Sequence, residues 1–125
     1  MFKKLLVVED EAEIRVFISE VIDTFDIFTQ IDQAENGQEA LARISNNKYD
    51  LVIMDVQMPK MNGIEVLKHL PANETPCLLI SGNFNPDVVE AAQKLGHKYL
   101  LVKPFRSKEL FEKLKMILKF ELVLK

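Results

Sequence analysis

Residues 51–55 read Leu-Val-Ile-Met-Asp, an apolar run that ends in a carboxylate. Such a run predicts a β-strand, Leu51–Met54, that is covered on both faces, as the strands of parallel sheets are. Leu5–Val8 and Cys77–Ile80 are runs of the same kind, and Tyr99–Val102 is another. Phe28–Gln33 predicts a further strand, although polar residues interrupt its apolar pattern. The sequence therefore predicts five short strands.

Between these strands the apolar residues repeat at helical spacing. From Ile14 to Phe25 they recur at i, i+3, i+4 and i+7, which indicates an amphipathic helix. Further helices are expected over residues 36–46, 62–70 and 86–95, and from Ser107 onward. Because strands and helices alternate strictly, the pattern predicts an α/β fold, a doubly wound parallel sheet with helices on both faces and right-handed crossovers.

Several helix starts carry local signals. Asp10, Asn36 and Asn62 each stand three residues before a glutamate, the spacing of a capping box. Asn85 is followed by Pro86, which predicts a cap and a proline in the first helical turn. Gly96 follows the fourth predicted helix, where a left-handed residue is common. Asp10 therefore has a structural interpretation as a helix cap, beside the one developed next.

In a doubly wound sheet, ligands bind at the carboxyl ends of the strands. The residues at the ends of four predicted strands carry chemistry: they are Glu9 and Asp10, Asp55, Ser81 and Lys103. Three carboxylates brought together repel one another, and a hard divalent cation such as Mg²⁺ relieves that repulsion. An ionised aspartate can attack phosphorus, while an ammonium and a hydroxyl stabilise phosphoryl oxygens. The set predicts a magnesium-assisted phosphoryl site, although each residue taken singly is also an ordinary loop residue.

Length and composition fit a single domain over residues 1–125. The formal net charge of −3 gives no positive field that would attract nucleic acid. The apolar stretch after Met1 is too short for a signal peptide or a membrane span, so we expect a cytoplasmic protein that does not bind membranes. Cys77, the only cysteine, is expected to be buried, and His69 and His97 are expected to be solvated.

Three segments resemble the response-regulator receiver family of two-component signalling. Residues 5–10 (Leu-Leu-Val-Val-Glu-Asp) resemble its first strand and acidic pair. Residues 50–59 (Asp-Leu-Val-Ile-Met-Asp-Val-Gln-Met-Pro), followed by Met61-Asn62-Gly63, resemble its phosphoacceptor strand and loop. Residues 102–105 (Val-Lys-Pro-Phe) resemble its lysine–proline signature. The resemblance implies a flavodoxin-like sheet of five parallel strands in the order 2-1-3-4-5, with five helices.

The resemblance also implies a role for each site residue. Asp55 would accept the phosphoryl group, and Lys103 and Ser81 would contact its oxygens. Mg²⁺ would be bound by Asp10 and Asp55, by Glu9 through water, and by the backbone carbonyl of Gln57. Pro104 would follow a cis peptide bond. The implied partners are a sensor histidine kinase or phosphotransfer protein that donates the phosphoryl group, and an output domain or protein at the fourth helix, fifth strand and fifth helix. A phosphorylation-dependent homodimer is also open.

The chain departs from the family at the position of its switching aromatic residue, where it has Leu100. Tyr99 is one residue away and should face the other side of its strand. We therefore expect Phe84, in the loop after Ser81, to be the aromatic residue that moves. Two other functions are alternatives. An aspartate-nucleophile phosphatase would need an acid where Gln57 stands, and a degenerate receiver that only binds partners would not need an intact Asp10, Asp55 and Lys103.

Overall fold

The computed structural model describes residues 2–58, 60–70 and 74–118, and the side chains from Lys4 onward. Its strands are β1 (Phe2–Val8), β2 (Phe28–Ala34), β3 (Leu51–Asp55), β4 (Cys77–Ser81) and β5 (Tyr99–Val102). Its helices are α1 (Ala12–Thr24), α2 (Gly37–Asn46), α3 (Gly63–Leu67), α4 (Pro86–Lys94) and α5 (Ser107–Ile117). All ten elements predicted from the sequence are present. A continuation of the last helix beyond Leu118 lies outside the described residues.

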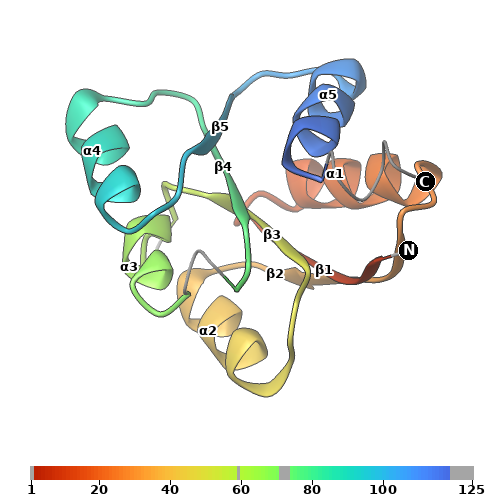
Figure 1. The fold of residues 1–125 in the computed structure, drawn as a ribbon, viewed down its shortest axis with the longest axis horizontal. Coiled ribbons are helices and arrows are strands. Elements are labelled where there is room, and N and C mark those ends of the chain that lie inside the picture. The colour runs from red at the N-terminus through yellow and green to blue at the C-terminus, as the bar shows by residue number, and fades with distance from the viewer. Residues whose placement is uncertain (1, 59, 71–73, 119–125) are drawn as a thin grey trace.

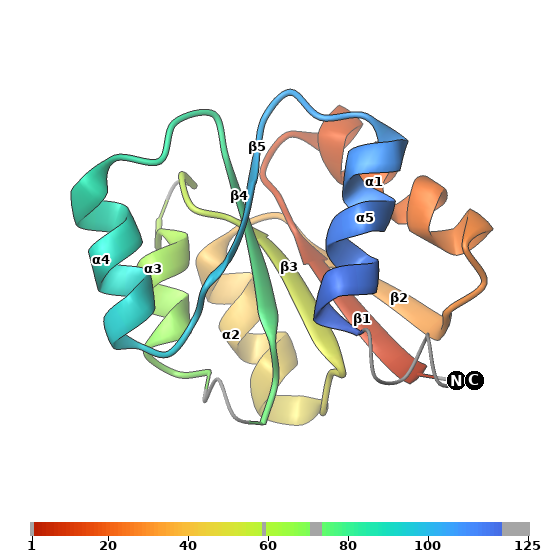
Figure 2. The same cartoon turned by 45° about the horizontal axis from the view of Figure 1, so that its top comes forward.

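The strands form one parallel sheet in the order β2-β1-β3-β4-β5 (Figure 1), which is the order that the family resemblance implied. Helices α1 and α5 cover one face of the sheet, and α2, α3 and α4 cover the other (Figure 2). The strand order reverses between β1 and β3: after β1 the chain passes to α1 on one face of the sheet, and after β3 it passes to α3 on the other face. In sheets of this kind ligands bind at this point, in the crevice outside the carboxyl ends of the strands. Glu9 and Asp10 follow the first of these strands and Asp55 ends the second.

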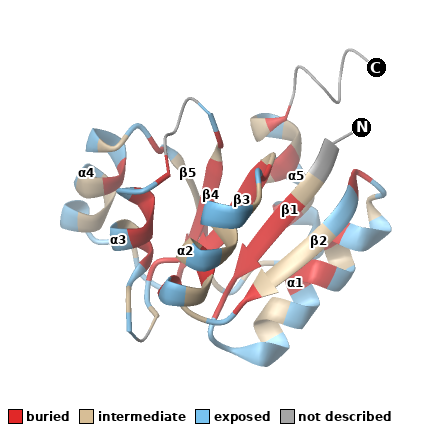
Figure 3. Ribbon diagram, turned by 90° about the horizontal axis from the view of Figure 1, so that it is seen from below, coloured by how far each residue is buried: buried red, intermediate tan, exposed pale blue. Residues whose placement is uncertain are grey.

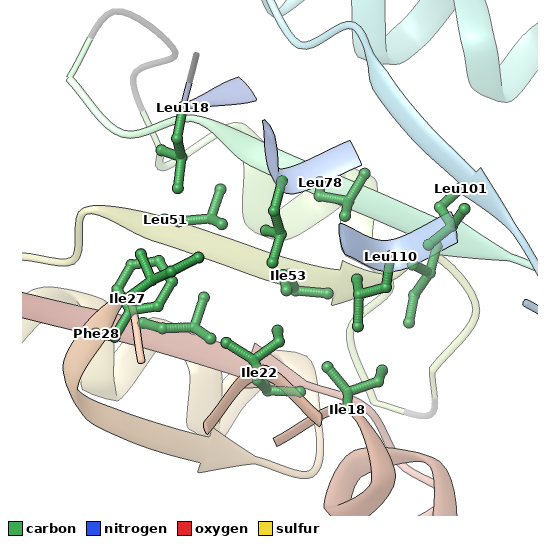
Figure 4. Packing of buried hydrophobic residues seen from close by; sticks show 14 residues of the cluster. Ile18, Ile22, Ile27, Phe28, Leu51, Ile53, Leu78, Leu101, Leu110 and Leu118 are labelled. Atoms are coloured by element: carbon green, nitrogen blue, oxygen red, sulfur yellow. The ribbon is translucent and has the colours of Figure 1, made fainter. Parts of the chain in front are cut away.

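Each face of the sheet has its own apolar core. On one face Ile18 and Ile22 of α1 and Leu110 and Leu114 of α5 pack over side chains of the central strands (Figure 4). On the other face, the helices contribute Ala40, Val66, Leu67 and Ala92. Strands β3 and β4 are buried along their length, and β1 is buried from Leu5 to Val8 (Figure 3), as their unbroken apolar runs predicted. Cys77 is buried, as expected.

Strand β2 is an edge strand, which accounts for its interrupted pattern. Its ends, Phe28 and Ala34, are buried, and its middle is partly exposed. The polar residues there have partners: the carboxylate of Asp32 accepts hydrogen bonds from the hydroxyl of Tyr49 at 2.7 Å and from the amide of Gln30 at 2.9 Å. The edge position therefore tolerates polar residues that a central strand would exclude.

Most of the predicted helix boundaries are confirmed. The side chains of Asn36, Asn62 and Asn85 accept hydrogen bonds from backbone amides three residues later, at 2.8, 3.0 and 2.9 Å. Gly96 has a φ of 87°, the left-handed conformation expected after α4. Helix α3 is shorter than predicted, because the chain tightens after Leu67 into bonds between residues three apart, such as His69 N to Val66 O.

Two predictions were wrong. Asp10 does not cap α1: the residue before the helix is Glu11, and no side chain caps that end. His97 is not solvated. It is buried, and its Nε2 lies 3.1 Å from the carbonyl oxygen of Leu70, so it links the α4–β5 turn to the end of α3. Burial lowers the pKa of His97 below its ordinary value, because the charged imidazolium is poorly solvated there.

Within the described part of the chain, no helix combines the length and the apolar character that crossing a membrane would require.

Candidate functional site

Three carboxylates meet in the crevice at the carboxyl edge of the sheet. Glu9, Asp10 and Asp55 each present an oxygen, and these three oxygens lie within 4.8 Å of one another. Glu9 and Asp55 are buried, while Asp10 is exposed at the rim. The sequence prediction that these residues converge is confirmed. The cluster can therefore present oxygen ligands to a hard cation from the solvent side.

Lys103 is the cation of the site. Its Nζ lies 2.7 Å from Oε1 of Glu9 and donates a hydrogen bond to Oδ2 of Asp55 at 3.1 Å. Burial by itself lowers the pKa of this ammonium, but the two carboxylates outweigh burial and raise the pKa above its ordinary value. Lys103 is positioned by the sheet, because its backbone N–H donates to the carbonyl of Ser81 at 2.8 Å. The peptide bond between Lys103 and Pro104 is cis.

One ammonium does not balance three carboxylates, and the structure carries signs of that imbalance. Oε1 of Glu9 is buried and accepts no well-formed hydrogen bond from the described residues, although Lys103 is near. Desolvation and the neighbouring Glu9 carboxylate raise the pKa of Asp10 above its ordinary value. An excess of negative charge on carboxylate oxygens is what a Mg²⁺ ion would satisfy, so these residues fit that ion.

Asp55 is held from its other side by the loop that follows it. Oδ1 accepts a hydrogen bond from the backbone N–H of Gln57 at 3.2 Å, so each carboxylate oxygen has a donor. Helix α3 begins directly against this loop, where Gly63 N donates to Val56 O at 2.9 Å. A Cβ on Gly63 would lie 2.8 Å from the carbonyl oxygen of Asp55. Glycine is therefore required there by the close approach of two backbone segments.

Ser81 ends β4 with its hydroxyl buried. The hydroxyl donates to the carbonyl of Asn83 at 3.0 Å and accepts from the backbone N–H of Asn83 at 3.1 Å. It is thus engaged with the β4–α4 loop in this conformation. Any movement of the hydroxyl toward Asp55 has to break both of these bonds.

Residues 5–115 match the family described as the response regulator receiver domain. The chain belongs to this family. It is 36% identical over 119 residues to the transcriptional regulatory protein CpxR homolog of Haemophilus influenzae. This alignment covers 93% of this chain and 50% of the relative. It is 34% identical over 113 residues to the chemotaxis protein CheY of Listeria monocytogenes, covering 89% of this chain and 94% of that protein. It thus spans half of one relative and nearly all of the other.

Solved structures agree with this assignment. The chemotaxis response regulator CheY4 of Vibrio cholerae superposes with a TM-score of 0.83 at 30% identity, over 94% of this chain and 99% of that chain. A chain of the CheX–CheY–BeF₃–Mg²⁺ complex from Borrelia burgdorferi superposes with a TM-score of 0.82 at 25% identity, over 91% and 87% of the two chains. The CheY-like, flavodoxin-like fold is thereby established.

Two of the residues expected to transmit a signal lie on the same face of the sheet in this receiver domain. Leu100 and Phe84 are both partly buried and pack against the same core, the one beneath α2, α3 and α4. Tyr99 packs against the opposite core, as the alternation of a strand predicted. Of these two aromatic residues, Phe84 is therefore the one on the same face as Leu100.

Sequence reasoning missed several contributors to the site. The backbone of Asn83 holds the hydroxyl of Ser81, and the side chain of Arg15 in α1 donates from Nη1 to the carbonyl oxygen of Glu9 at 2.8 Å. Gln33 of β2 accepts from Nε of the same arginine at 3.1 Å. Nothing in the sequence marked these side chains, since arginine on an amphipathic helix and glutamine on a strand are ordinary surface residues. Their contacts depend on how the turn after β1 is folded.

Proposed function

We propose that this receiver domain accepts a phosphoryl group on Asp55 from a phosphohistidine of a sensor kinase or phosphotransfer protein. The observation that carries the proposal is the environment of this carboxylate. It is buried at the strand end, with Lys103 on one oxygen and two further carboxylates within reach of a shared cation. A structural ion pair alone would not need the acidic excess around it.

The transfer is an exchange of bonds at phosphorus. An oxygen of Asp55 attacks, the bond from phosphorus to the histidine nitrogen breaks, and that nitrogen keeps the electron pair. The product is an acyl phosphate, which water later hydrolyses to restore the carboxylate and release phosphate. Lys103 offsets the charge on the transferred oxygens, and the N–H of Gln57 orients the carboxylate through Oδ1. The protein contributes position and charge.

Asp10, Asp55 and the backbone carbonyl of Gln57 would hold Mg²⁺, with Glu9 acting through water. A bound Mg²⁺ neutralises the negative charge of the transferred group. Glu9 suits the indirect role because its Oε2 already accepts from the N–H of Glu11 at 3.1 Å, which fixes the carboxylate at the inner wall of the crevice. The relative from Borrelia burgdorferi was solved in a complex with BeF₃ and Mg²⁺, which supports the same chemistry here.

Intact-protein mass spectrometry tests the site. With Mg²⁺ and acetyl phosphate or phosphoramidate, the wild-type chain should gain one phosphoryl group, and Asp55→Asn should gain none. Asp50→Asn is the matched control: it removes a carboxylate at the opposite end of β3 and should leave labelling intact. Equal labelling of wild type and Asp55→Asn would refute the assignment of Asp55.

The signal is proposed to leave through the β4–α4 loop. If the hydroxyl of Ser81 turns to the phosphoryl group, it releases both of its bonds to Asn83. The next residues in the chain, Phe84 and the capping residue Asn85, would then move with the loop. A cleft of about 420 Å³ beside α4 gives this end of the helix room to move; it is lined by Val56, Gln57, Met58, Asn62, Ile64 and Val88. The output surface would then be α4, β5 and α5, open to an output domain, a separate protein or a second copy.

Amide NMR with and without beryllofluoride tests this relay. Phe84→Ala should reduce the shift changes of α4 more than Leu100→Ala does, because leucine has no polar end that distinguishes an exposed from a buried position. If the response of α4 survives Phe84→Ala and disappears in Leu100→Ala, the relay through Phe84 is wrong. The switch would then lie at position 100, as it does in the family.

A further inference from the structure

The turn that carries Glu9 and Asp10 is held from outside the crevice by Arg15. This side chain leaves the second turn of α1 and reaches back to the end of β1. Its Nη1 donates to the backbone carbonyl oxygen of Glu9 at 2.8 Å, and its Nε donates to Oε1 of Gln33 at 3.1 Å. One guanidinium thus ties together the ends of two neighbouring strands and the first helix.

The turn needs such support because α1 begins without a side-chain cap. A capping aspartate at position 10 would direct its carboxylate at the helix backbone and away from the crevice. Instead Asp10 is exposed at the rim, and its carboxylate belongs to the acidic cluster. The bond from Arg15 to the Glu9 carbonyl, with the bond from Glu11 N to the Glu9 side chain, holds the chain just before Asp10 without using the Asp10 carboxylate.

We propose that Arg15 is a positioning residue for the magnesium site, and that Gln33 orients it. The proposal rests on the proposed function, since it concerns the ion that this function requires. Arg15 acts through the backbone at Glu9. Its planar fork matches two acceptors at once, one on the turn and one on β2, which the single ammonium of a lysine cannot reproduce.

Loss of a side chain that orients metal ligands lowers metal affinity by about 10- to 100-fold in proteins. The lower end applies here, because the arginine touches the backbone beside the ligands and not the ligands themselves. We therefore expect Arg15→Gln to raise the dissociation constant for Mg²⁺ by about tenfold. Gln33→Met, which leaves Arg15 in place without its second acceptor, should raise it by a smaller factor.

The experiment is a titration of the full chain with MgCl₂, in which amide NMR and calorimetry measure the binding of Mg²⁺. Arg15→Lys keeps the charge and loses the fork, so it should bind Mg²⁺ nearly as weakly as Arg15→Gln. Arg43→Gln is the control for charge: it removes an arginine that pairs with Asp32 of β2 and Glu39 of α2, and should bind Mg²⁺ like wild type. Urea unfolding in EDTA reports whether each variant is folded.

The outcomes separate the proposals. Wild-type affinity in Arg15→Lys, with weak binding in Arg15→Gln, would mean that charge alone matters and would overturn the positioning role. Wild-type affinity in Arg15→Gln would overturn it as well, while leaving the proposed function intact. A wild-type chain that binds no Mg²⁺ would overturn both. Equal weakening by Arg15→Gln and Arg15→Lys, less by Gln33→Met and none by Arg43→Gln, is the expected result.

Discussion

Replacing Lys103 by methionine tests how much the site depends on its one ammonium. Methionine keeps the length of the side chain and its apolar stem, so the change removes mainly the charge. In the absence of metal, it leaves the carboxylates of Glu9 and Asp55 facing each other and Asp10 without a counterion. We expect Lys103→Met to lower the free energy of unfolding in EDTA and to lower it much less in Mg²⁺.

The magnitude follows from the burial of the groups. The Glu9 and Asp55 side chains are 0% and 4% exposed, and Lys103 is 17% exposed. At an effective dielectric constant of about 20, each contact near 3 Å is worth roughly 5 kcal/mol before desolvation is subtracted. Removal of one partner from a buried ion pair has a net effect of about 3–5 kcal/mol. A domain of this size has about 5–15 kcal/mol of stability, so the variant should still fold.

Urea unfolding measured by circular dichroism, in EDTA and in excess MgCl₂, gives the two free energies. Lys94→Met is the matched control, because Lys94 pairs with Glu90 at 2.9 Å on the exposed surface of α4. Its effect should stay below about 1 kcal/mol in both buffers. The reasoning is refuted if Lys103→Met is as harmless in EDTA as Lys94→Met, or if Mg²⁺ restores none of the lost stability.

Two further predictions concern positions outside the ion pair. Gly63→Ala should destabilise the domain by about 1–3 kcal/mol and shift the amide resonances around Asp55, because the new Cβ meets the Asp55 carbonyl. Gly82→Ala is the control: a Cβ there has nothing within 4 Å, so the change should be nearly neutral. Unfolding and NMR of both variants decide this, and equal effects would contradict it. The folded-state pKa of His97 is below the ordinary value of 6.5, so its neutral form contributes stability above pH 6.5 that is lost as pH falls through the folded pKa. His97→Gln should therefore flatten the loss of stability below pH 6.5, and His69→Gln, which changes an exposed histidine, is the matched control. A loss as steep in His97→Gln as in wild type would count against the prediction.

Much of the fold could be predicted because the signals were local and repeated. Central strands such as Leu51–Asp55 are buried on both faces, so their apolar runs are unbroken and few other structures suit them. The three asparagine caps are short-range patterns that the structure reproduces. The end of α3 was less predictable, since helix ends are set by small differences between bonds four and three residues apart.

The meeting of Glu9, Asp10, Asp55 and Lys103 at one edge of the sheet was predictable for a topological reason. Parallel strands bring their carboxyl ends to one edge, so a residue's place in the strand fixes its place in the site. What could not be predicted is how side chains partner across elements. His97 looked like a turn residue, and only the packing of α3 against the α4–β5 turn buries it. The bonds of Asn83 and Arg15 depend in the same way on backbone geometry that no spacing rule encodes.

The acidic turn breaks local rules that most of the chain obeys. Helix α1, like α5, has no cap from the side chain of its N-cap residue, where α2, α3 and α4 have one, and a buried oxygen of Glu9 accepts no well-formed hydrogen bond from the described residues. Such local conflicts are expected where function opposes stability. Two cations hold this turn by different atoms of Glu9. Lys103 pairs with the side-chain carboxylate of Glu9, and Arg15 donates to the backbone carbonyl of Glu9. Phosphorylation of Asp55 would move Lys103 toward the phosphoryl oxygens, while the bond from Arg15 to the Glu9 carbonyl would stay in place. The turn can thus keep its geometry while Lys103 changes partner, which a turn held by Lys103 alone could not do.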